Sequence, residues 1–159
     1  MASIDKTITV DVPLLVAYVQ WTRFEEFSLF MEGVREVRQL DHKRLHWRAV
    51  VMGREVDWFA EITQQVPGRC IAWRSLSASR NAGGVSFQSL GPSRTLLTLR
   101  MELELAGGTE IPGTVLALVS TRLEGDLRRF KTFIEERDHA SRQDHGELRG
   151  APIRQSSAF

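Results

Sequence analysis

The stretch LHWRAVVMGREVDWFAEITQQVPGRCIAWRS, residues 45–75, decides the fold of this chain. Apolar and polar residues alternate along it, and the turn residues Gly53 and Pro67-Gly68 interrupt the alternation. Alternation of this kind is typical of strands with one buried face. Connections this short join antiparallel neighbours, because a parallel crossover needs about a dozen residues. The stretch therefore predicts three consecutive antiparallel strands, at about 43–52, 54–66 and 69–76.

The same alternation predicts which face of these strands is buried. The inner set consists of Leu45, Trp47, Ala49, Val51, Val56, Trp58, Ala60, Ile62, Ile71, Trp73 and Ser75. The opposite face carries charges of both signs, such as Arg48 and Asp57, which can pair across neighbouring strands. Three of the four tryptophans therefore share the buried face of one sheet.

Further strands flank this stretch on both sides and complete a predicted sheet of seven. Alternation and turn residues place them at about 3–11, 34–40, 83–90 and 94–105. Their inner positions include Phe87, Leu99 and Met101. Gly83-Gly84 is not followed by the helix that a phosphate-binding loop requires, so we expect a bulge or bend in the strand there.

Two short helices are predicted between the first and second strands. Pro13 suits the start of a helix, and Thr22 with Glu25 has the spacing of a capping box that would begin a second helix ending at Gly33. The apolar side of this second helix consists of Phe24, Phe27, Phe30 and Met31. Because such short helices are marginal alone, we expect these four side chains to form a lid over the sheet.

A long amphipathic helix is predicted after the last strand. Apolar residues recur at helical spacing at Leu116, Val119, Leu123, Leu127, Phe130 and Ile134, which indicates a helix of roughly 25 residues. The polar segment from about residue 140 has no period, and we expect a disordered tail over 140–159. The chain is thus predicted to be one α+β domain, residues 1–139, in which a curved antiparallel sheet wraps around the long helix.

Composition excludes several classes of function. The formal net charge is +1, from 21 basic and 20 acidic side chains in 159 residues, so nucleic-acid binding is not expected. There is no apolar run of about 20 residues and no signal-peptide pattern, so we expect a cytoplasmic protein without stable membrane insertion. Cys70 is the only cysteine, and the four histidines have no ligand spacing. We therefore expect no metal and no cofactor.

The order of elements resembles the helix-grip fold of the START-like (SRPBCC) superfamily. Four strings are similar to its polyketide cyclase/dehydrase branch, which includes coenzyme-Q-binding-like proteins, and they are AYVQWTRFEEFSLFMEGVREVRQLD (17–41), residues 45–75, NAGGVSF (81–87) and GDLRRFKTFIE (125–135). The resemblance covers roughly residues 3–137. It implies a deep apolar cavity between the sheet and the long helix. Members bind lipids, sterols, quinones, polyketides or plant hormones there, and some catalyse cyclisation or dehydration.

The first hypothesis is therefore a binding module for a small hydrophobic molecule, such as a lipid, a quinone or a polyketide-like compound. The expected binding residues come from the inner face of the sheet and from the long helix, and they are Trp47, Trp58, Trp73, Phe87, Leu99, Met101, Leu116, Val119 and Leu123. A pocket lined in this way would bind a flat or extended apolar molecule.

Two alternatives remain open from the sequence. One is a cyclase or dehydratase without a metal, in which Tyr18 on the first helix assists proton transfer, since the inner face offers almost no other acid or base. The other is a structural or interaction domain whose large residues fill the core completely. An exposed apolar surface on the helices of residues 18–31 would favour this last case, or a homodimer formed through them.

Overall fold

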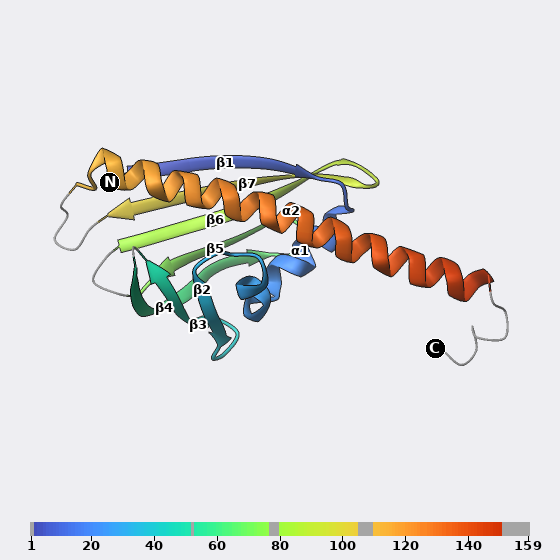
Figure 1. Cartoon of the computed structure of the whole chain (residues 1–159), viewed down its shortest axis with the longest axis horizontal. Helices are drawn as coiled ribbons and strands as arrows, with labels where there is room; N and C mark the ends of the chain where they lie inside the picture. Colours follow the sequence, from blue (N-terminus) through green and yellow to red (C-terminus); the bar gives the residue numbers. More distant parts are fainter. Residues whose placement is uncertain (1, 52, 77–79, 105–109, 151–159) are drawn as a thin grey trace.

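The computed structural model describes residues 2–51, 53–76, 80–104 and 110–150 of the chain (Figure 1). The elements in order are β1 (Ala2–Val10), α1 (Leu14–Thr22), the 3-10 helix η1 (Phe24–Leu29), β2 (Val34–Gln39), β3 (Arg44–Val51), β4 (Arg54–Val66), β5 (Cys70–Ser75), β6 (Arg80–Gly91), β7 (Arg94–Glu104) and α2 (Gly113–Gly150). The order of the elements is the predicted one, and the strands other than β6 begin and end close to their predicted bounds.

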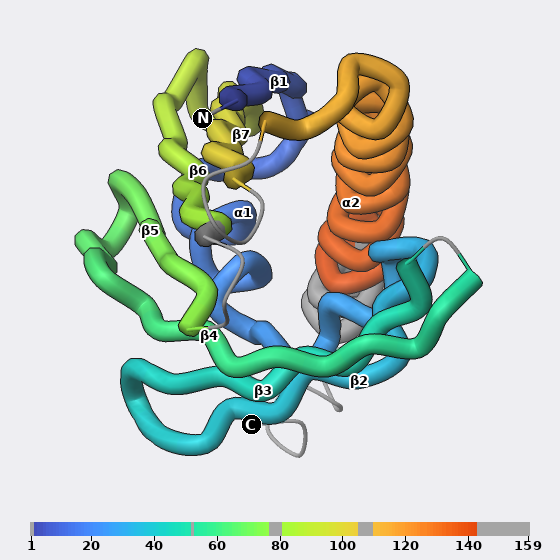
Figure 2. The backbone as a smooth tube through the Cα atoms, turned by 90° about the vertical axis from the view of Figure 1, so that its left-hand side faces the viewer, coloured from blue at the N-terminus to red at the C-terminus, as the bar shows by residue number. Residues whose placement is uncertain are grey.

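The strands form one antiparallel sheet in the order β1-β7-β6-β5-β4-β3-β2. Figure 2 shows the sheet curling around α2, with β1 and β2 at opposite ends of the curl and α1 beside the strands. The far end of α2 extends beyond the sheet (Figure 1). The predicted α+β helix-grip fold, with seven antiparallel strands wrapped around a long C-terminal helix, is confirmed.

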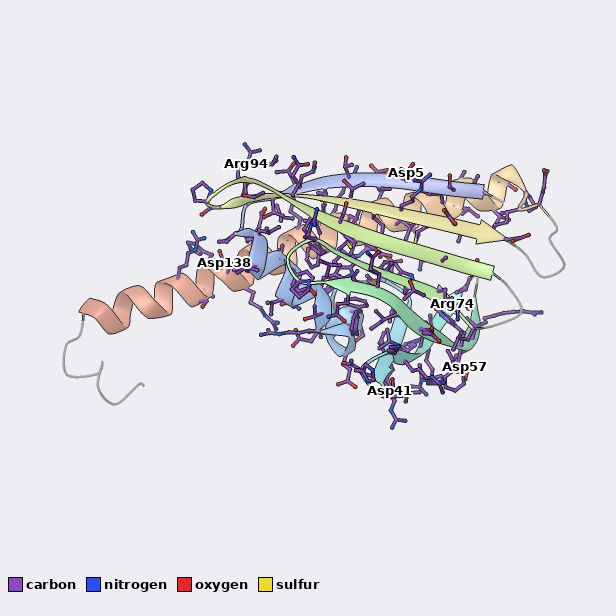
Figure 3. The ribbon with its side chains drawn as sticks, turned by 180° about the vertical axis from the view of Figure 1, so that it is seen from behind. Asp5, Asp41, Asp57, Arg74, Arg94 and Asp138 are labelled. Carbon is purple, nitrogen blue, oxygen red and sulfur yellow. The ribbon has the colours of Figure 1, made fainter. Side chains whose placement is uncertain are left out.

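The outer face of the sheet is charged and solvated, as the alternation predicted. Arg74 pairs with Glu61 across β4 and β5 at 3.4 Å, and Arg100 pairs with Asp5 across β1 and β7 at 3.6 Å. Asp5, Asp57 and Arg74 are labelled on this side of the sheet in Figure 3. Exposed pairs of this kind contribute little to stability. With these charges on the solvent-facing side, the apolar face of the sheet is the one that faces α2.

The core lies between the sheet and the second half of the apolar stripe of α2. Leu127, Phe130 and Ile134 are buried, and the Phe130 ring meets Trp21 and Phe30 edge to face, each at a centroid distance of 5.1 Å. Such edge-to-face pairs add to the hydrophobic burial of the rings. The short helices are thus fastened to α2 by aromatic packing.

The inner face is not buried along its whole length. Val51 and Val56, on either side of the Gly53 turn, were expected on the buried side but are 48% and 37% exposed. Their neighbours Ala49 and Ala60 are buried. The end of the β3–β4 hairpin therefore extends beyond the part of the sheet that the rest of the domain covers.

The predicted capping box at Thr22 and Glu25 is wrong. Thr22 is the last residue of α1, and its hydroxyl donates to the carbonyl oxygen of Val19 at 2.6 Å. The Glu25 carboxylate accepts a hydrogen bond from the backbone N–H of Gln39 at 3.1 Å instead. A tertiary contact with β2 has replaced the local cap, and the second helix is a short 3-10 helix that ends at Leu29 rather than at Gly33.

Two further expectations differ from the structure. β6 begins at Arg80 and keeps a continuous register through Gly83-Gly84, where a bulge or bend was expected. The register shifts at other places, between Ser89 and Gly91 near the end of β6, between Ile62 and Gln64 in β4, and between Val34 and Glu36 in β2. α2 is longer than expected, since it continues past residue 139 to Gly150. The remainder of the predicted tail, residues 151–159, lies outside the described residues.

Candidate functional site

A cavity of about 220 Å³ lies between the curled sheet and α2. Its sheet side is formed by inward-facing residues of the six strands β2 to β7. These residues are Val34, Leu45, Trp47, Trp58, Ala60, Ile62, Ile71, Trp73, Ser75, Asn81, Leu99 and Met101. At roughly 30 Å³ per water, this volume equals that of about seven water molecules. The interior of the domain is therefore not completely filled by side chains.

Helical residues close the other side of the cavity. They are Trp21 from α1, Phe24 and Phe27 from η1, Met31 from the following turn, and Leu123, Asp126 and Leu127 from α2. Phe24 and Phe27 meet edge to face at 5.6 Å, and Trp21 meets Phe27 at the same distance. Edge-to-face contacts of this kind hold these rings together as one wall.

Tryptophan rings dominate the sheet side of the cavity. Trp47 and Trp58 occupy paired positions on β3 and β4, and their rings stack with an interplanar angle of 8° and a centroid distance of 5.7 Å. Phe27 contacts Trp47 directly, at a centroid distance of 5.6 Å. The η1 rings therefore contact the stacked tryptophans at Phe27 and Trp47. Both groups of rings also line the cavity.

Few polar side chains reach this apolar space, and they are Ser75, Asn81 and Asp126. Asp126 is 9% exposed, and its Oδ1 atom accepts hydrogen bonds from Arg129 Nη2 and from the backbone N–H of Glu32, the latter at 3.2 Å. Burial raises the pKa of Asp126 above its ordinary value, although Arg129 acts in the opposite direction. The cavity wall thus contains a carboxyl group that holds its proton more tightly than usual.

The segment Phe30–Glu32, which carries the lining residue Met31, is held on α2 by arginine side chains. Arg129 Nε donates to the Phe30 carbonyl at 2.9 Å, and Arg122 Nη1 donates to the Glu32 carbonyl at 2.9 Å. The Arg129 guanidinium also pairs with the Glu32 carboxylate at 3.4 Å. These contacts, together with the one from Asp126, fix this part of the cavity margin to the helix.

The described part of the chain offers no metal-binding cluster and no membrane-spanning helix. It contains no group of three or more His, Cys, Asp or Glu side chains placed to hold a metal ion. None of its helices is long and apolar enough to cross a membrane. The enclosed apolar cavity is the candidate binding site of this part of the chain.

Comparison with known proteins agrees with this architecture. Residues 10–132 match the family described as polyketide cyclase/dehydrase and lipid transport. The chain belongs to the polyketide cyclase/dehydrase and lipid transport family. The match runs from the end of β1 to the buried middle of α2, so it includes every element that lines the cavity.

Relatives of this family member include an uncharacterised 17.2 kDa protein encoded between melC2 and rnhH in Streptomyces lincolnensis. It is 39% identical over 154 residues, which cover 96% of this chain and 100% of the relative. The Zhui aromatase/cyclase from Streptomyces sp. R1128 superposes with a TM-score of 0.76 at 19% identity, over 88% of this chain and 97% of that one. A START superfamily protein from Mycobacterium smegmatis gives a TM-score of 0.68 at 16% identity, over 85% and 95%. At these identities the two structures establish a shared fold.

Most of the binding residues expected from the sequence of this family member lie in the cavity lining. The structure brings together Trp47, Trp58, Trp73, Leu99, Met101 and Leu123 from the expected binding set, and Phe24, Phe27 and Met31 from the expected lid. Strand alternation and helical spacing identify side chains that face the same interior, so they select most of the lining.

Other expected residues lie elsewhere. Phe87 packs edge to face against Tyr18 and Trp21, and Phe30 packs against Phe130 and Phe133. Leu116 and Val119 are half-buried on the first turns of α2 and are not part of the lining. Tyr18 is also outside the lining, and its hydroxyl is buried without a hydrogen-bond partner in the described structure.

The most informative residue that the sequence analysis missed is Asp126. It is one of several charged residues in the segment of the long helix. However, it lies three residues after Leu123 and four before Phe130, so helical spacing places it within the apolar stripe. An acidic residue inside such a stripe was the signal that could have identified it.

Proposed function

We propose that this protein binds a small, largely apolar ring compound in the cavity between the sheet and α2. The observation that carries the proposal is the unfilled volume of about 220 Å³ lined by Trp47, Trp58 and Trp73. A cavity of about 150 Å³ lined by apolar side chains holds one benzene, whereas drug-sized ligands occupy about 300–1,000 Å³. The expected ligand is therefore compact, about the size of two fused rings.

The shape of the lining supports a flat ligand. The parallel Trp47 and Trp58 rings offer flat aromatic surface, and Phe27 bounds it on the helical side. Offset stacking between aromatic rings contributes about 0.5–1.5 kcal/mol beyond the burial of area. The family description includes lipid transport, which is consistent with apolar cargo, but a long acyl chain is larger than the cavity.

The test is a calorimetric titration with naphthalene as the probe and the protein in the syringe. Ala60 is buried in the lining, so Ala60→Leu should occupy part of the cavity and weaken naphthalene binding at least about tenfold. Ala72→Leu is the matched control, because Ala72 lies on the opposite face of the neighbouring strand β5, between the inward-facing Ile71 and Trp73. It should bind naphthalene like the unmodified protein.

Circular dichroism should establish that both variants are folded. Absence of any naphthalene binding by the unmodified protein would refute the proposal. Equal binding by Ala60→Leu would show that naphthalene binds somewhere else.

A second candidate is a cyclase or dehydratase that acts in the same cavity. The observation that favours it is the buried carboxyl of Asp126, whose raised pKa suits proton transfer closer to neutral pH than an ordinary aspartate allows. Tyr18 remains a predicted participant without a place in the lining. If turnover of a polyketide-like substrate is found, Asp126→Asn should abolish most of it, and Tyr18→Phe tests the tyrosine.

A further inference from the structure

Asp126 is the charged side chain of the cavity lining, and its position needs an explanation. It lies on the stripe of α2 that otherwise buries Leu127, Phe130 and Ile134. A carboxylate removed from water is costly unless its oxygens are hydrogen-bonded and its charge is paired. The hydrogen-bond partners of its two oxygens therefore indicate which ligand group could still bind to the carboxylate.

The two oxygens of Asp126 differ in their partners. Oδ1 accepts hydrogen bonds from Arg129 and from the backbone N–H of Glu32. Oδ2 accepts none from the residues that the structure describes. Among the described residues, the fully enclosed polar side-chain atoms without a partner are the Tyr18 hydroxyl and Trp21 Nε1, and Oδ2 of Asp126 is not one of them. Oδ2 is therefore an unused acceptor that borders open space.

The charges around Asp126 limit the kind of donor that fits. Arg129 pairs with Oδ1, and the Arg122 guanidinium on the same helix also acts on the carboxyl group through space. From the opposite segment, the Glu32 carboxylate pairs with Arg129 at 3.4 Å. Because the negative charge of Asp126 already has a cationic partner, a ligand ammonium group would add an unbalanced positive charge. A neutral hydroxyl group can donate a hydrogen bond to Oδ2 without adding a charge.

We propose that the ligand is a compact ring compound bearing a hydroxyl group, which donates a hydrogen bond to Oδ2 of Asp126 while its rings lie against Trp47 and Trp58. This inference rests on the proposed binding function. It adds the chemical class of the ligand, a ring alcohol or phenol, and makes Asp126 the residue that selects it. The apolar walls bind the ring, and the carboxylate discriminates among rings of the same size.

Three probes of nearly equal shape separate these two contributions in the unmodified protein. They are naphthalene, which lacks a polar group, 2-naphthol, which donates a hydrogen bond, and 2-methoxynaphthalene, which has the oxygen without the donor. Hydrogen bonds to charged acceptors are stronger than neutral ones, so 2-naphthol should bind at least about tenfold more tightly than either of the others. Calorimetric titration gives all three dissociation constants.

The variant Asp126→Asn tests whether this residue causes the preference. Its amide oxygen can still accept from the Glu32 N–H, while its NH₂ group replaces the free Oδ2 acceptor. The preference for 2-naphthol should fall to within about twofold. Asp138→Asn is the matched control, because Asp138 also lies on α2 and also pairs with an arginine, Arg142, but does not line the cavity. It should keep the full preference.

A second measurement does not depend on a variant. In protein with ¹³C-labelled aspartate, the carboxyl resonance of Asp126 should shift on addition of 2-naphthol and shift much less with naphthalene. This arm remains informative even if Asp126→Asn fails to fold.

The possible outcomes separate the two proposals. Equal affinity of the unmodified protein for all three probes would overturn the hydroxyl inference and leave cavity binding standing. A 2-naphthol preference that survives in Asp126→Asn would also overturn it, because another group would then recognise the donor. Binding of none of the probes would overturn the proposed function, and this inference with it.

Discussion

At the scale of single residues, Gly83 shows how a missing side chain shapes the cavity. It pairs with Trp73 on β5 and with Met101 on β7, both of which line the cavity. A Cβ atom at Gly83 would lie 2.5 Å from Met101 Sδ and 2.9 Å from Trp73 Cζ2. Glycine therefore allows these two side chains to lie across its backbone, which accounts for a glycine inside a strand that has no bulge there.

We expect Gly83→Ala to weaken naphthalene binding by about fivefold or more, because the added methyl group forces Trp73 or Met101 to move in a closely packed wall. Gly84→Ala is the control. Its new Cβ would lie no closer than 3.4 Å to a neighbour, the carbonyl oxygen of Ile71, and Gly84 has the opposite orientation on the strand. Calorimetric titration of both variants measures the difference, and equal affinities would exclude a role for Gly83 in shaping the site.

At the scale of elements, α2 does more than cover the sheet. Its first turns carry half-buried residues such as Leu116, whereas its middle buries Leu127 and Phe130 and holds the segment Phe30–Glu32 through arginine hydrogen bonds. The middle of the helix thus supplies both apolar packing and the polar margin of the cavity. Asp126 lies on the buried stripe and also hydrogen-bonds within that polar margin, so its ionisation links the stability of the domain to pH.

Because burial raises the pKa of Asp126 in the folded state, its ionisation opposes folding. As the pH rises past the unfolded pKa of about 3.8, the unfolded chain releases this proton while the folded protein retains it until its own, higher pKa. The contribution of Asp126 to the free energy of unfolding therefore falls through this window. Asp126→Asn cannot ionise, so its stability relative to the unmodified protein should rise as the pH increases past the unfolded pKa of about 3.8 and level off above the folded pKa.

Chemical denaturation at a series of pH values measures this difference. Asp41 provides a contrast of opposite sign, because hydrogen bonds from the backbone N–H groups of Lys43 and Arg44 lower the pKa of its carboxyl group. Its stabilising contribution is present above the unfolded pKa and is lost as the pH falls. A pH-independent difference between Asp126→Asn and the unmodified protein would contradict the burial of an ionisable group at this position.

At the scale of the whole molecule, the cavity connects ligand binding to global stability. Its lining comes from β2 to β7 and from all the helices, so a bound ligand contacts most of the domain at once. A ligand that binds only the folded state stabilises it by mass action. A ligand that occupies the unfilled interior should therefore increase the free energy of unfolding.

With 2-naphthol at one hundred times its dissociation constant, the free energy of unfolding should increase by about 2.7 kcal/mol. For a domain of this size the corresponding rise in Tm is about 5–10 °C, measured by a thermal scan followed by circular dichroism. Ala60→Leu should lose most of this rise, whereas Ala72→Leu should retain it. A similar rise in both variants would indicate binding outside the cavity.

Much of the fold followed from local pattern. Strand alternation predicted β4 at Arg54–Val66 with its observed bounds, and helical spacing from Leu116 to Ile134 predicted the apolar stripe of α2. The failed capping box has an identifiable cause. At Thr22 and Glu25 a local capping pattern was overridden by a tertiary hydrogen bond to Gln39, which no pattern within a few residues could reveal.

The sequence by itself determined the order of the elements and the inward-facing side of most strands, because periodicity and short turns act over a few residues along the chain. Its resemblance to known members indicated the family, which the family match over residues 10–132 confirms. Only the tertiary structure decided that the buried face encloses an open volume of about 220 Å³. It also decided that Asp126, rather than Tyr18, reaches that volume. The physical reason is that the cavity is the part of the enclosed volume that side chains do not fill. That volume depends on how tightly the sheet curves and on how the rings pack, and both depend on contacts between residues far apart in sequence.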